Sequence, residues 1–482
     1  MKLTDLLEDC DVLTERNLAD IDVKGLTDDS REIEPGYVFI AVQGYSHDGH
    51  QYIDEAIKRG ASVIIGERSL SLDIPYVQVK CSKKVLGEMV SRFYGNPSKD
   101  KIVIGVTGSN GKTTTSYMIK AIFDQNGYRS SLIGTIEYLI NGKSSPSKNT
   151  TPGAVSLQRM LYECEDDVII IEVSSHALKQ HRVAGIQFDT VIFTNLDCEH
   201  LDYHHSMEDY FKAKSMIFDL LKKDGQAIVN TDDEWGRKAY QLLLKLGKPV
   251  LTVGTKPNQD IRILPDQHGV YIKGNKADET LELKIPGLHN RYNAAFAIMV
   301  GELIGLERQK SIYGLNHVEK VDGRFQIVYF PGNKNVVIDY AHTPNGFYHC
   351  LNTIKQCGAR RIIHVFGFRG MRDRSKRLMM MKQTLDVSDY YILTFDDLNG
   401  IDPKEMEKTL FDFNTHYDEN RGDVITDRTL AIERAIELAR EGDWVIITGK
   451  GHEQYKLDFE WGTKTDLETV ETILHHTKEL SL

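Results

Sequence analysis

The stretch 106–114, which reads Val-Thr-Gly-Ser-Asn-Gly-Lys-Thr-Thr, has the residue types of a phosphate-binding loop. Gly108 and Gly111 let the backbone curl so that its N–H groups converge on phosphate oxygens. Lys112 would reach the outer phosphates of a nucleotide, and the Thr113 hydroxyl would hold Mg²⁺. An apolar run precedes the loop and a helical pattern follows it, so the pattern favours nucleotide binding over an ordinary strand–helix crossing.

Other polar residues stand where predicted buried strands end. Glu172 interrupts one apolar run, Asp339 closes a second, and Gly449 follows a third. A carboxylate beside such a loop is the usual second holder of nucleotide Mg²⁺, although a helix-capping carboxylate gives the same pattern. Because ligands bind at the carboxyl ends of parallel strands, these residues indicate a cleft between domains.

The segment 194–205 is dense in side chains that can bind metals. A zinc site is disfavoured, because no cysteine pair accompanies the histidines, whereas a polar loop with chance histidines stays open. Lys214, by spacing alone, has the pattern of a surface lysine on a helix. Arg324 could reach across a domain boundary to a nucleotide, or belong to an ordinary hinge turn.

A basic cluster follows another predicted strand and contains Arg369, Arg372, Arg374, Lys376 and Arg377. In an acidic protein such a cluster is a candidate site for a carboxylate or phosphate of a substrate. The alternative is a solvated loop.

Three segments alternate predicted strands with predicted helices, which indicates an α/β fold with parallel sheets covered on both faces. We expect domains at residues 1–98, 99–326 and 327–482. The predicted strands are 37–42, 62–66, 76–79, 102–106, 168–173, 189–194, 227–230, 336–339, 362–366, 390–394 and 445–448.

Composition narrows the class of protein. The chain has 482 residues, 41% of them hydrophobic and 27% charged, which suits a globular protein of several domains. A net charge of −11 argues against a nucleic-acid binder. Six scattered cysteines without a C-x-x-C pair indicate reduced thiols. No apolar run is membrane-length and the first residues lack a signal peptide's apolar core, so we expect a cytoplasmic protein without membrane insertion.

Taken together and in order, these motifs resemble the Mur ligase family of ATP-dependent enzymes that add amino acids to peptidoglycan precursors. The resemblance runs through Asp29-Ser30-Arg31, Asp48-Gly49-His50, the glycine-rich loop, Asn149-Thr150-Thr151-Pro152, His200-Leu201-Asp202-Tyr203-His204, Asp339 to Pro344 and Gly449 to Glu453. The chain looks most like the branch that adds the third amino acid to UDP-MurNAc-L-Ala-D-Glu. The resemblance implies an N-terminal uridine-nucleotide-binding domain, a central P-loop ATPase-like domain and a C-terminal Rossmann-like domain.

The resemblance also implies roles for single residues, with ATP and Mg²⁺ as cofactors. ATP would be held by Gly108, Ser109, Asn110, Gly111, Lys112, Thr113, Thr114, Asn290, Asn293, Arg324 and Asp339. The UDP-MurNAc-dipeptide would be held by Ser30, Tyr45, Ser46, His47, Asn149, Thr150, Thr151, Ser174, Gln180 and Arg182. The incoming amino acid would be held by Arg372, Asp396, Asp397, Asn399, Gly449 and Glu453.

The implied catalytic residues are Lys112, Glu172, His200 and Lys214, and the implied metal ligands are Thr113, Glu172, His200 and Lys214. Lys214 matches the family's carbamylated lysine (N6-carboxylysine), an anion that can bind a second Mg²⁺. In the implied reaction the D-glutamate carboxylate attacks the γ-phosphate of ATP, and the amine of an amino acid displaces phosphate from the acyl phosphate. The partners would be these small molecules, and we expect a monomer.

Departures from the family pattern bear on the amino acid. Glu199 stands where aspartate is usual, and Arg369 stands where glycine is usual. Diaminopimelate-adding enzymes carry Asp-Asn-Pro-Arg, whose arginine grips the distal carboxylate, whereas residues 396–399 read Asp-Asp-Leu-Asn. An acidic pocket suits a distal ammonium, so L-lysine is expected before meso-diaminopimelate, although Arg369 could supply a substitute guanidinium. A paralogue that uses another carboxylate acceptor, and a P-loop ATPase or regulator that has lost ligation, are the alternatives.

Overall fold

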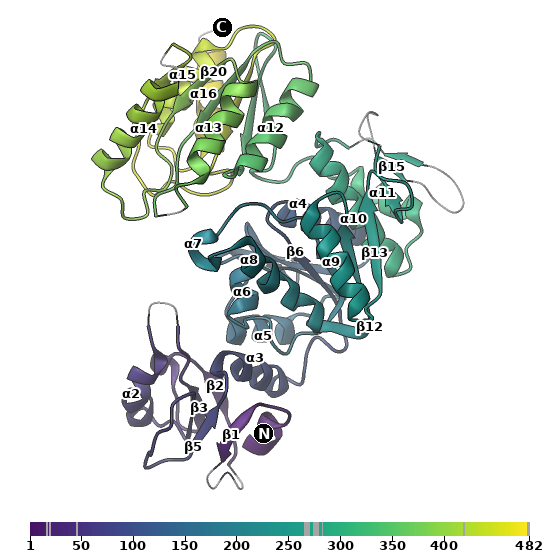
Figure 1. Ribbon diagram of the computed structural model, residues 1–482, viewed down its shortest axis with the longest axis vertical. Helices are drawn as coiled ribbons and strands as arrows, with labels where there is room; N and C mark the ends of the chain where they lie inside the picture. Colours follow the sequence, from purple (N-terminus) through teal and green to yellow (C-terminus); the bar gives the residue numbers. More distant parts are fainter. Residues whose placement is uncertain are drawn as a thin grey trace.

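The computed structural model describes the chain except residues 16, 17, 19, 20, 45, 46, 265–269, 273–278, 282, 372, 418, 419 and 480–482. Three bodies, each built around a sheet, lie one above the other along the long axis, with the N-terminal body at one end and the C-terminal body at the other (Figure 1). Parallel strands alternate with helices in all three, which confirms the predicted α/β fold class.

The N-terminal domain has a five-stranded sheet in the order β1-β5-β4-β3-β2, parallel except for β1. The strands are β1 (Val12–Glu15), β2 (Gly25–Thr27), β3 (Tyr37–Ile40), β4 (Val63–Gly66) and β5 (Tyr76–Val79). Helices α1 (Leu3–Leu7) and α3 (Ser82–Phe93) share one apolar cluster with the sheet, and α2 (Ile53–Lys58) shares another. Strands β3, β4 and β5 were predicted; the short β1 and β2 were not.

The central domain has a nine-stranded sheet in the order β14-β13-β12-β11-β6-β10-β7-β8-β9. The strands are β6 (Ile102–Thr107), β7 (Ser130–Ile133), β8 (Glu137–Ile140), β9 (Lys143–Pro146), β10 (Val168–Glu172), β11 (Phe188–Phe193), β12 (Leu221–Asn230), β13 (Val250–Gly254) and β14 (Ile261–Arg262). A separate hairpin joins β15 (Val270–Ile272) and β16 (Glu279–Leu281). Strand β12 begins six residues before the predicted 227, because its first half is polar and mostly lies outside the core.

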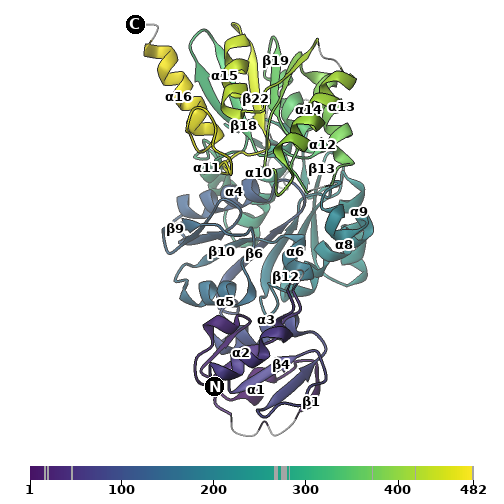
Figure 2. The same cartoon turned by 90° about the vertical axis from the view of Figure 1, so that its left-hand side faces the viewer.

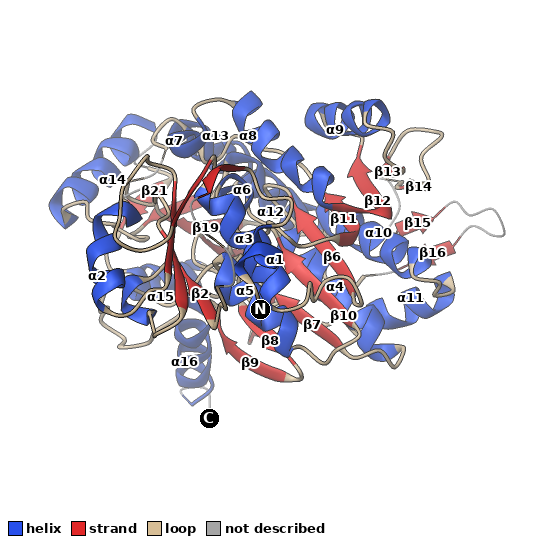
Figure 3. Ribbon diagram, turned by 90° about the horizontal axis from the view of Figure 1, so that it is seen from below, coloured by secondary structure: helices blue, strands red, loops and turns tan. Residues whose placement is uncertain are grey.

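Alternate residues of the central strands enter two separate cores, as the twofold period of a strand requires. One core receives α4 (Lys112–Gln125), α10 (Leu288–Leu303) and α11 (Arg308–Leu315). The other receives α5 (Ala154–Glu163), α6 (Ser175–Lys179), α8 (Met207–Ser215) and α9 (Glu234–Lys245). Helices therefore cover both faces of the sheet (Figures 2 and 3).

The C-terminal domain has a six-stranded sheet in the order β17-β18-β22-β19-β20-β21 with one antiparallel edge strand, β17. The strands are β17 (Gln326–Phe330), β18 (Lys334–Asp339), β19 (Ile362–Phe366), β20 (Tyr390–Leu393), β21 (Gly422–Val424) and β22 (Trp444–Thr448). Helices α12 (Pro344–Gln356), α13 (Lys376–Val387) and α14 (Pro403–Tyr417) contribute to one core, and α15 (Arg428–Leu438) and α16 (Asp466–Glu479) to the other.

The domain arrangement places two sets of strand ends together. Strand β6 lies between β10 and β11, so the loops after these three parallel strands share one edge of the central sheet. The loop after β18 of the C-terminal domain contacts that edge through His342 and Glu199. Within the described part of the chain, no helix has the length and apolar character that crossing a membrane requires.

Candidate active site

A cavity of about 700 Å³ lies between the central and C-terminal domains. Part of its wall comes from residues that were predicted for nucleotide binding, dipeptide binding or catalysis. These are Ser109, Asn110, Gly111, Lys112, Thr113, Thr114, Asn149, Thr150, Thr151, Ser174, Arg182, His200, Asn290, Asn293, Arg324 and Asp339. The fold therefore gathers at one place residues that are up to 230 positions apart (339 minus 109).

The glycine-rich loop has the backbone that its sequence requires. Gly108 has φ 143° and Gly111 has φ 86°, conformations that side-chain-bearing residues rarely adopt. A Cβ on Gly108 would collide with the Thr194 hydroxyl, and one on Gly111 would lie 2.5 Å from Oδ1 of Asn293. Both glycines are thus needed for the loop to sit between its neighbours.

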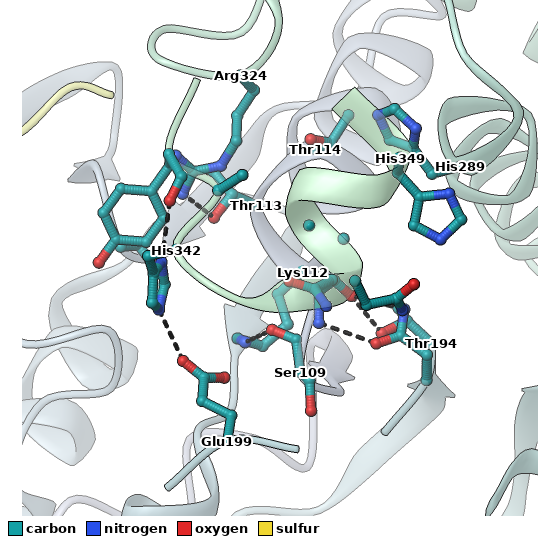
Figure 4. Close-up of a pocket in the computed structure, with 18 of the residues that line it drawn as sticks. Ser109, Lys112, Thr113, Thr114, Thr194, Glu199, His289, Arg324, His342 and His349 are labelled. Carbon is teal, nitrogen blue, oxygen red and sulfur yellow. Dashed lines mark hydrogen bonds and ion pairs between the residues drawn. The ribbon is translucent and has the colours of Figure 1, made fainter. Parts of the chain in front are cut away.

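Lys112, the first residue of α4, curls back over this loop (Figure 4). Its Nζ atom donates to the carbonyl oxygens of Gly108 and Ser109 at 2.8 and 3.0 Å. Burial lowers the pKa of Lys112, against the pull of Glu199 and Glu172. The side chain is placed where a phosphate on the loop would meet a cation.

Glu172, the last residue of β10, is fully buried and has three donors. Its oxygens accept from the Thr113 hydroxyl at 3.0 Å, the Thr135 hydroxyl at 2.8 Å and the Thr135 N–H at 3.1 Å. Nη2 of Arg324, from the segment just before β17, in turn donates to the Thr113 hydroxyl at 3.2 Å. A buried carboxylate beside a hydroxyl is an oxygen donor set that fits Mg²⁺.

The other two predicted metal ligands, His200 and Lys214, have different partners. No group of three or more His, Cys, Asp or Glu side chains among the described residues could hold a metal on its own. That finding does not weigh against Mg²⁺, which is commonly bound through one or two carboxylates together with substrate phosphates.

Lys214, near the end of α8, is not a surface residue, so the alternative drawn from its spacing is wrong. Its side chain is 1% exposed, its Nζ atom donates to the Gly108 carbonyl oxygen at 2.8 Å, and it lies 4.8 Å from the Tyr210 ring centre. Burial, and then the ammonium of Lys112, hold the pKa of Lys214 well below its usual value. A neutral amine is the form that reacts with carbon dioxide to give a carbamate.

His200 precedes α7 (Leu201–His204) and has the left-handed φ of 58°. Burial lowers the pKa of His200 to about 4, so the ring is neutral near pH 7. Its Nε2 atom lies 3.5 Å from Oε1 of Glu199. Burial opposes ionisation of Glu199, but the adjacent His200, His342 and Lys376 hold its pKa well below the usual range.

The residues expected around the base, ribose or phosphates of ATP have hydrogen-bond partners in two separate groups. The Asn293 amide donates to Asn290 at 3.1 Å and accepts from the Thr115 hydroxyl at 3.1 Å. Both carboxylate oxygens of Asp339 accept backbone N–H groups at 2.6 Å, from Phe325 and Ala341. Arg324 lies 4.4 Å from the centre of the Tyr340 ring.

Some of the residues expected to hold the UDP-MurNAc-dipeptide line the cavity and others do not. Arg182 donates to the Thr151 carbonyl oxygen at 3.0 Å and to Oε1 of Gln180 at 2.8 Å, so Gln180 orients Arg182 without lining the cavity. Ser30 and His47 belong to the N-terminal domain and do not line it either; the Ser30 hydroxyl donates to Glu55 at 3.0 Å. Tyr45 and Ser46 lie outside the described residues.

The described residues expected to hold the amino acid do not line the cavity. None of Asp396, Asp397, Asn399, Gly449 and Glu453 lines the cavity, and Arg372 lies outside the described residues. Asp397 is bonded to the ammonium groups of Lys450 and Lys456 at 2.6 and 2.8 Å, and Asp396 lies 3.5 Å from Arg369. The expected acidic pocket is therefore wrong as stated: cations of the chain itself neutralise both aspartates.

Sequence reasoning missed several residues of the site. Thr135 follows β7, a strand that was not predicted because two of its four residues are serine. Its position just after a parallel strand is the signal that could have found it. His289 of α10 and His349 of α12 also line the cavity (Figure 4), and no spacing in the sequence connects them.

Comparison with protein families matches three parts of the chain. Residues 22–98 match the Mur ligase family catalytic domain, residues 106–301 the Mur ligase middle domain, and residues 323–451 the glutamate ligase domain of Mur ligases. The three matches follow one another along the chain in the same order as the three sheets.

Two relatives are both named UDP-N-acetylmuramoyl-L-alanyl-D-glutamate–2,6-diaminopimelate ligase. The one from Caldanaerobacter subterraneus subsp. tengcongensis is 37% identical over 95% of each chain. The one from Aquifex aeolicus is 38% identical over 90% of each chain.

Solved structures give the same assignment. A structure of a UDP-N-acetylmuramoyl-L-alanyl-D-glutamate–2,6-diaminopimelate ligase superposes with a TM-score of 0.67 at 27% identity, over 96% of this chain and 98% of the other. A MurF ligase from Thermotoga maritima in complex with ADP shares the fold, with a TM-score of 0.65 at 19% identity over 96% and 100% of the chains. The chain therefore belongs to the Mur ligase family and is an ATP-dependent amide ligase that works with Mg²⁺.

Proposed function

We propose that the protein adds the third amino acid to UDP-MurNAc-L-Ala-D-Glu during synthesis of peptidoglycan precursors. The observation that carries the proposal is the cavity, whose wall combines the glycine-rich loop with Thr150, Thr151 and Arg182 of the expected dipeptide site. The printed names of the relatives, which are UDP-N-acetylmuramoyl-L-alanyl-D-glutamate ligases, support the same acceptor.

The first step is the attack of the D-glutamate carboxylate on the γ-phosphate of ATP. The loop N–H groups and Lys112 bind the phosphates and offset the negative charge that develops between two anions. Thr113 and Glu172 would hold Mg²⁺, which neutralises phosphate charge when bound. The carboxylate oxygen forms a bond to phosphorus, the bond to the ADP oxygen breaks, and the products are an acyl phosphate and ADP.

In the second step the amine of the incoming amino acid attacks the acyl carbon. A tetrahedral species forms, phosphate leaves, and the nitrogen loses a proton as the amide is made. The C-terminal domain would bring the amino acid to the acyl phosphate. Arg324, which lies just before that domain, donates a hydrogen bond to Thr113 of the phosphate site. His200 and a carbamate on Lys214 complete the proposed catalytic set.

For the amino acid, we propose L-lysine before meso-diaminopimelate. The support is Asn399, an amide that donates to the Gly370 carbonyl oxygen at 3.1 Å, at the position where the diaminopimelate pattern has a gripping arginine. A distal carboxylate would lose a bidentate partner there. Meso-diaminopimelate is the second candidate, favoured by the printed names of the relatives. A paralogue with another carboxylate acceptor and a non-ligating ATPase are the remaining alternatives.

Phosphate release from ATP tests the proposal. The assay combines the protein with UDP-MurNAc-L-Ala-D-Glu and screens L-lysine, meso-diaminopimelate, L-ornithine and neutral amino acids. Release that requires both the acceptor and an amino acid, with formation of the tripeptide product by mass spectrometry, is the expected result. ATP hydrolysis that is indifferent to the acceptor would reject tripeptide synthesis, and turnover of meso-diaminopimelate alone would reject the lysine preference.

We also propose domain boundaries near residues 98 and 326, between α3 and β6 and at the start of β17. A monomer in the cytoplasm stays a prediction from the sequence.

A further inference from the structure

Among the described residues of the predicted basic cluster, two line the cavity, namely Arg369 and Lys376. Arg369 comes from the loop after β19, and its side chain is only 11% exposed. Its guanidinium carbon lies 5.1 Å from the centre of the Tyr340 ring, which also lines the cavity. A buried guanidinium beside a cavity in a ligase is a candidate substrate contact.

Acceptors behind the cavity wall hold this guanidinium in one orientation. Nη2 donates to the Gly449 carbonyl oxygen at 2.6 Å and to Oε2 of Glu453 at 2.7 Å. Nε lies 3.5 Å from Oδ2 of Asp396, whose side chain is 1% exposed. Glu453 is itself fixed, because its other oxygen accepts from the Tyr340 hydroxyl at 2.8 Å.

These acceptors do not line the cavity, whereas Arg369 does. The guanidinium thus separates them from the space that a substrate would enter. An ammonium group in the cavity would meet a like charge there, and a carboxylate would meet an opposite one.

Not all N–H donors of the Arg369 guanidinium have an acceptor among the described residues. Arginine has five N–H donors, and the two on Nη2 are used by Gly449 and Glu453. Nη1 has one long contact, 3.4 Å to the Tyr340 hydroxyl oxygen, and Nε lacks a hydrogen-bond partner among the described residues. Nη1 therefore retains donor capacity, and a carboxylate is the group whose geometry a guanidinium edge matches.

We infer that Arg369 binds a carboxylate of the amino acid that the enzyme adds, and so helps to select that amino acid. The inference rests on the proposed function. Two carboxylates could be the one bound: the α-carboxylate, which every candidate amino acid has, and the distal carboxylate of meso-diaminopimelate. If Arg369 binds the distal carboxylate of meso-diaminopimelate, it replaces the arginine that residues 396–399 lack. If it binds the α-carboxylate, it does not.

The test compares the wild type with Arg369→Gln and Arg369→Lys in the phosphate-release assay. The substrates are L-lysine, meso-diaminopimelate and L-lysinamide, which has no carboxylate. If the screen selects another amino acid, that amino acid and its carboxamide replace the lysine pair. Arg374→Gln is the matched control, since Arg374 is a 65% exposed arginine of the same loop that pairs with Glu405.

We expect Arg369→Gln to lower kcat/KM for carboxylate-bearing amino acids by about 10- to 100-fold, as loss of a charge-assisted hydrogen bond does. The value for L-lysinamide and the KM for ATP should stay near those of the wild type. An equal loss for L-lysine and meso-diaminopimelate assigns the α-carboxylate, and a loss for meso-diaminopimelate alone assigns the distal one. Equal losses for acid and amide, no loss at all, or a rise confined to the KM for ATP would overturn the inference.

Two provisions keep the outcome interpretable. Arg369→Gln removes one of the cations that face Glu453 and Asp396, so its folding is checked by thermal unfolding. If it unfolds, Arg369→Lys carries the test, because the ratio of kcat/KM between acid and amide does not depend on the folded fraction. If the wild type ligates and the variants keep its ratio of kcat/KM for the amino acid to kcat/KM for the carboxamide, the Arg369 assignment alone is rejected. If the wild type does not ligate at all, the proposed function is rejected.

Discussion

Oε1 of Glu199 lies 2.7 Å from Nε2 of His342, so a direct polar contact joins the central and C-terminal domains (Figure 4). The other ring nitrogen of His342 lies 2.9 Å from the Tyr340 carbonyl oxygen. A carbonyl and a carboxylate only accept, so each ring nitrogen of His342 faces an acceptor oxygen. Glu199 also adjoins His200, and the contact therefore couples the position of the C-terminal domain to the proposed catalytic residues.

The first prediction concerns this pair. We expect Glu199→Gln and His342→Gln each to lower kcat/KM for the amino acid about 10-fold, and the double variant to be no worse than either single one. The physical reason is that both changes weaken the same contact, so their effects do not add. Steady-state kinetics of the wild type, the two single variants and the double variant test this double-mutant cycle. The control is Glu208→Gln, at a 66% exposed glutamate of α8. Additive losses would show that the two side chains act independently.

A second prediction follows from the burial of Lys214. We expect Lys214→Ala to lower kcat by at least about 100-fold, the scale of losing a placed charge in an active site. Acetate or propionate should restore part of the activity, because a free carboxylate can stand where the carbamate was. Lys212→Ala, on the same helix but 77% exposed, should be near wild type. Full activity of Lys214→Ala without added acid would refute the carbamate.

Thr135 supplies a third prediction, since it gives Glu172 both a hydroxyl and an N–H donor. Thr135→Val keeps the shape and removes the hydroxyl, so the carboxylate should be less well oriented and the KM for Mg²⁺ should rise about 10-fold. Thr135→Ser should keep the wild-type KM. Titration of activity and of nucleotide binding with Mg²⁺ measures the effect. Equal behaviour of the valine and serine variants would exclude a role of the hydroxyl.

Asn399 gives a fourth prediction, on selectivity. Asn399→Arg should raise kcat/KM for meso-diaminopimelate relative to L-lysine by about 10-fold, because a guanidinium can grip a distal carboxylate with two hydrogen bonds. The residue has φ 48°, a left-handed conformation that asparagine tolerates better than arginine. Asn399→Gly is therefore the control for loss of the amide without backbone strain. An unchanged ratio would place the distal group of the amino acid elsewhere.

A fifth prediction concerns stability. Arg428 and Asp466 are both fully buried and share two hydrogen bonds, of 2.6 and 2.8 Å. Arg428→Met leaves a buried carboxylate without its cation and should destabilise the C-terminal domain by about 3–5 kcal/mol. Arg434→Met, at a 47% exposed position of the same helix, should cost less than about 1 kcal/mol. Scanning calorimetry would resolve the transition, and equal shifts for both variants would contradict the expected role of burial.

The sequence by itself determined the α/β class, four of the nine strands of the central domain's sheet and the glycine-rich loop. These features are local: apolar runs of strand length, and glycines at Gly108 and Gly111 that a phosphate loop needs. Strands such as β7 and β9 escaped prediction, because serine and lysine take up much of them and tertiary pairing overrides their weak propensity.

Only the tertiary structure decided which charges meet. Spacing placed Lys214 on a helix surface, but the packing of α8 against the loop buries its Nζ atom beside Gly108. The family resemblance suggested an acidic pocket at Asp396 and Asp397, but Arg369, Lys450 and Lys456 come from the ends of other strands and neutralise both. Electrostatic environment depends on distances between residues far apart in the chain, and a linear pattern does not contain those distances.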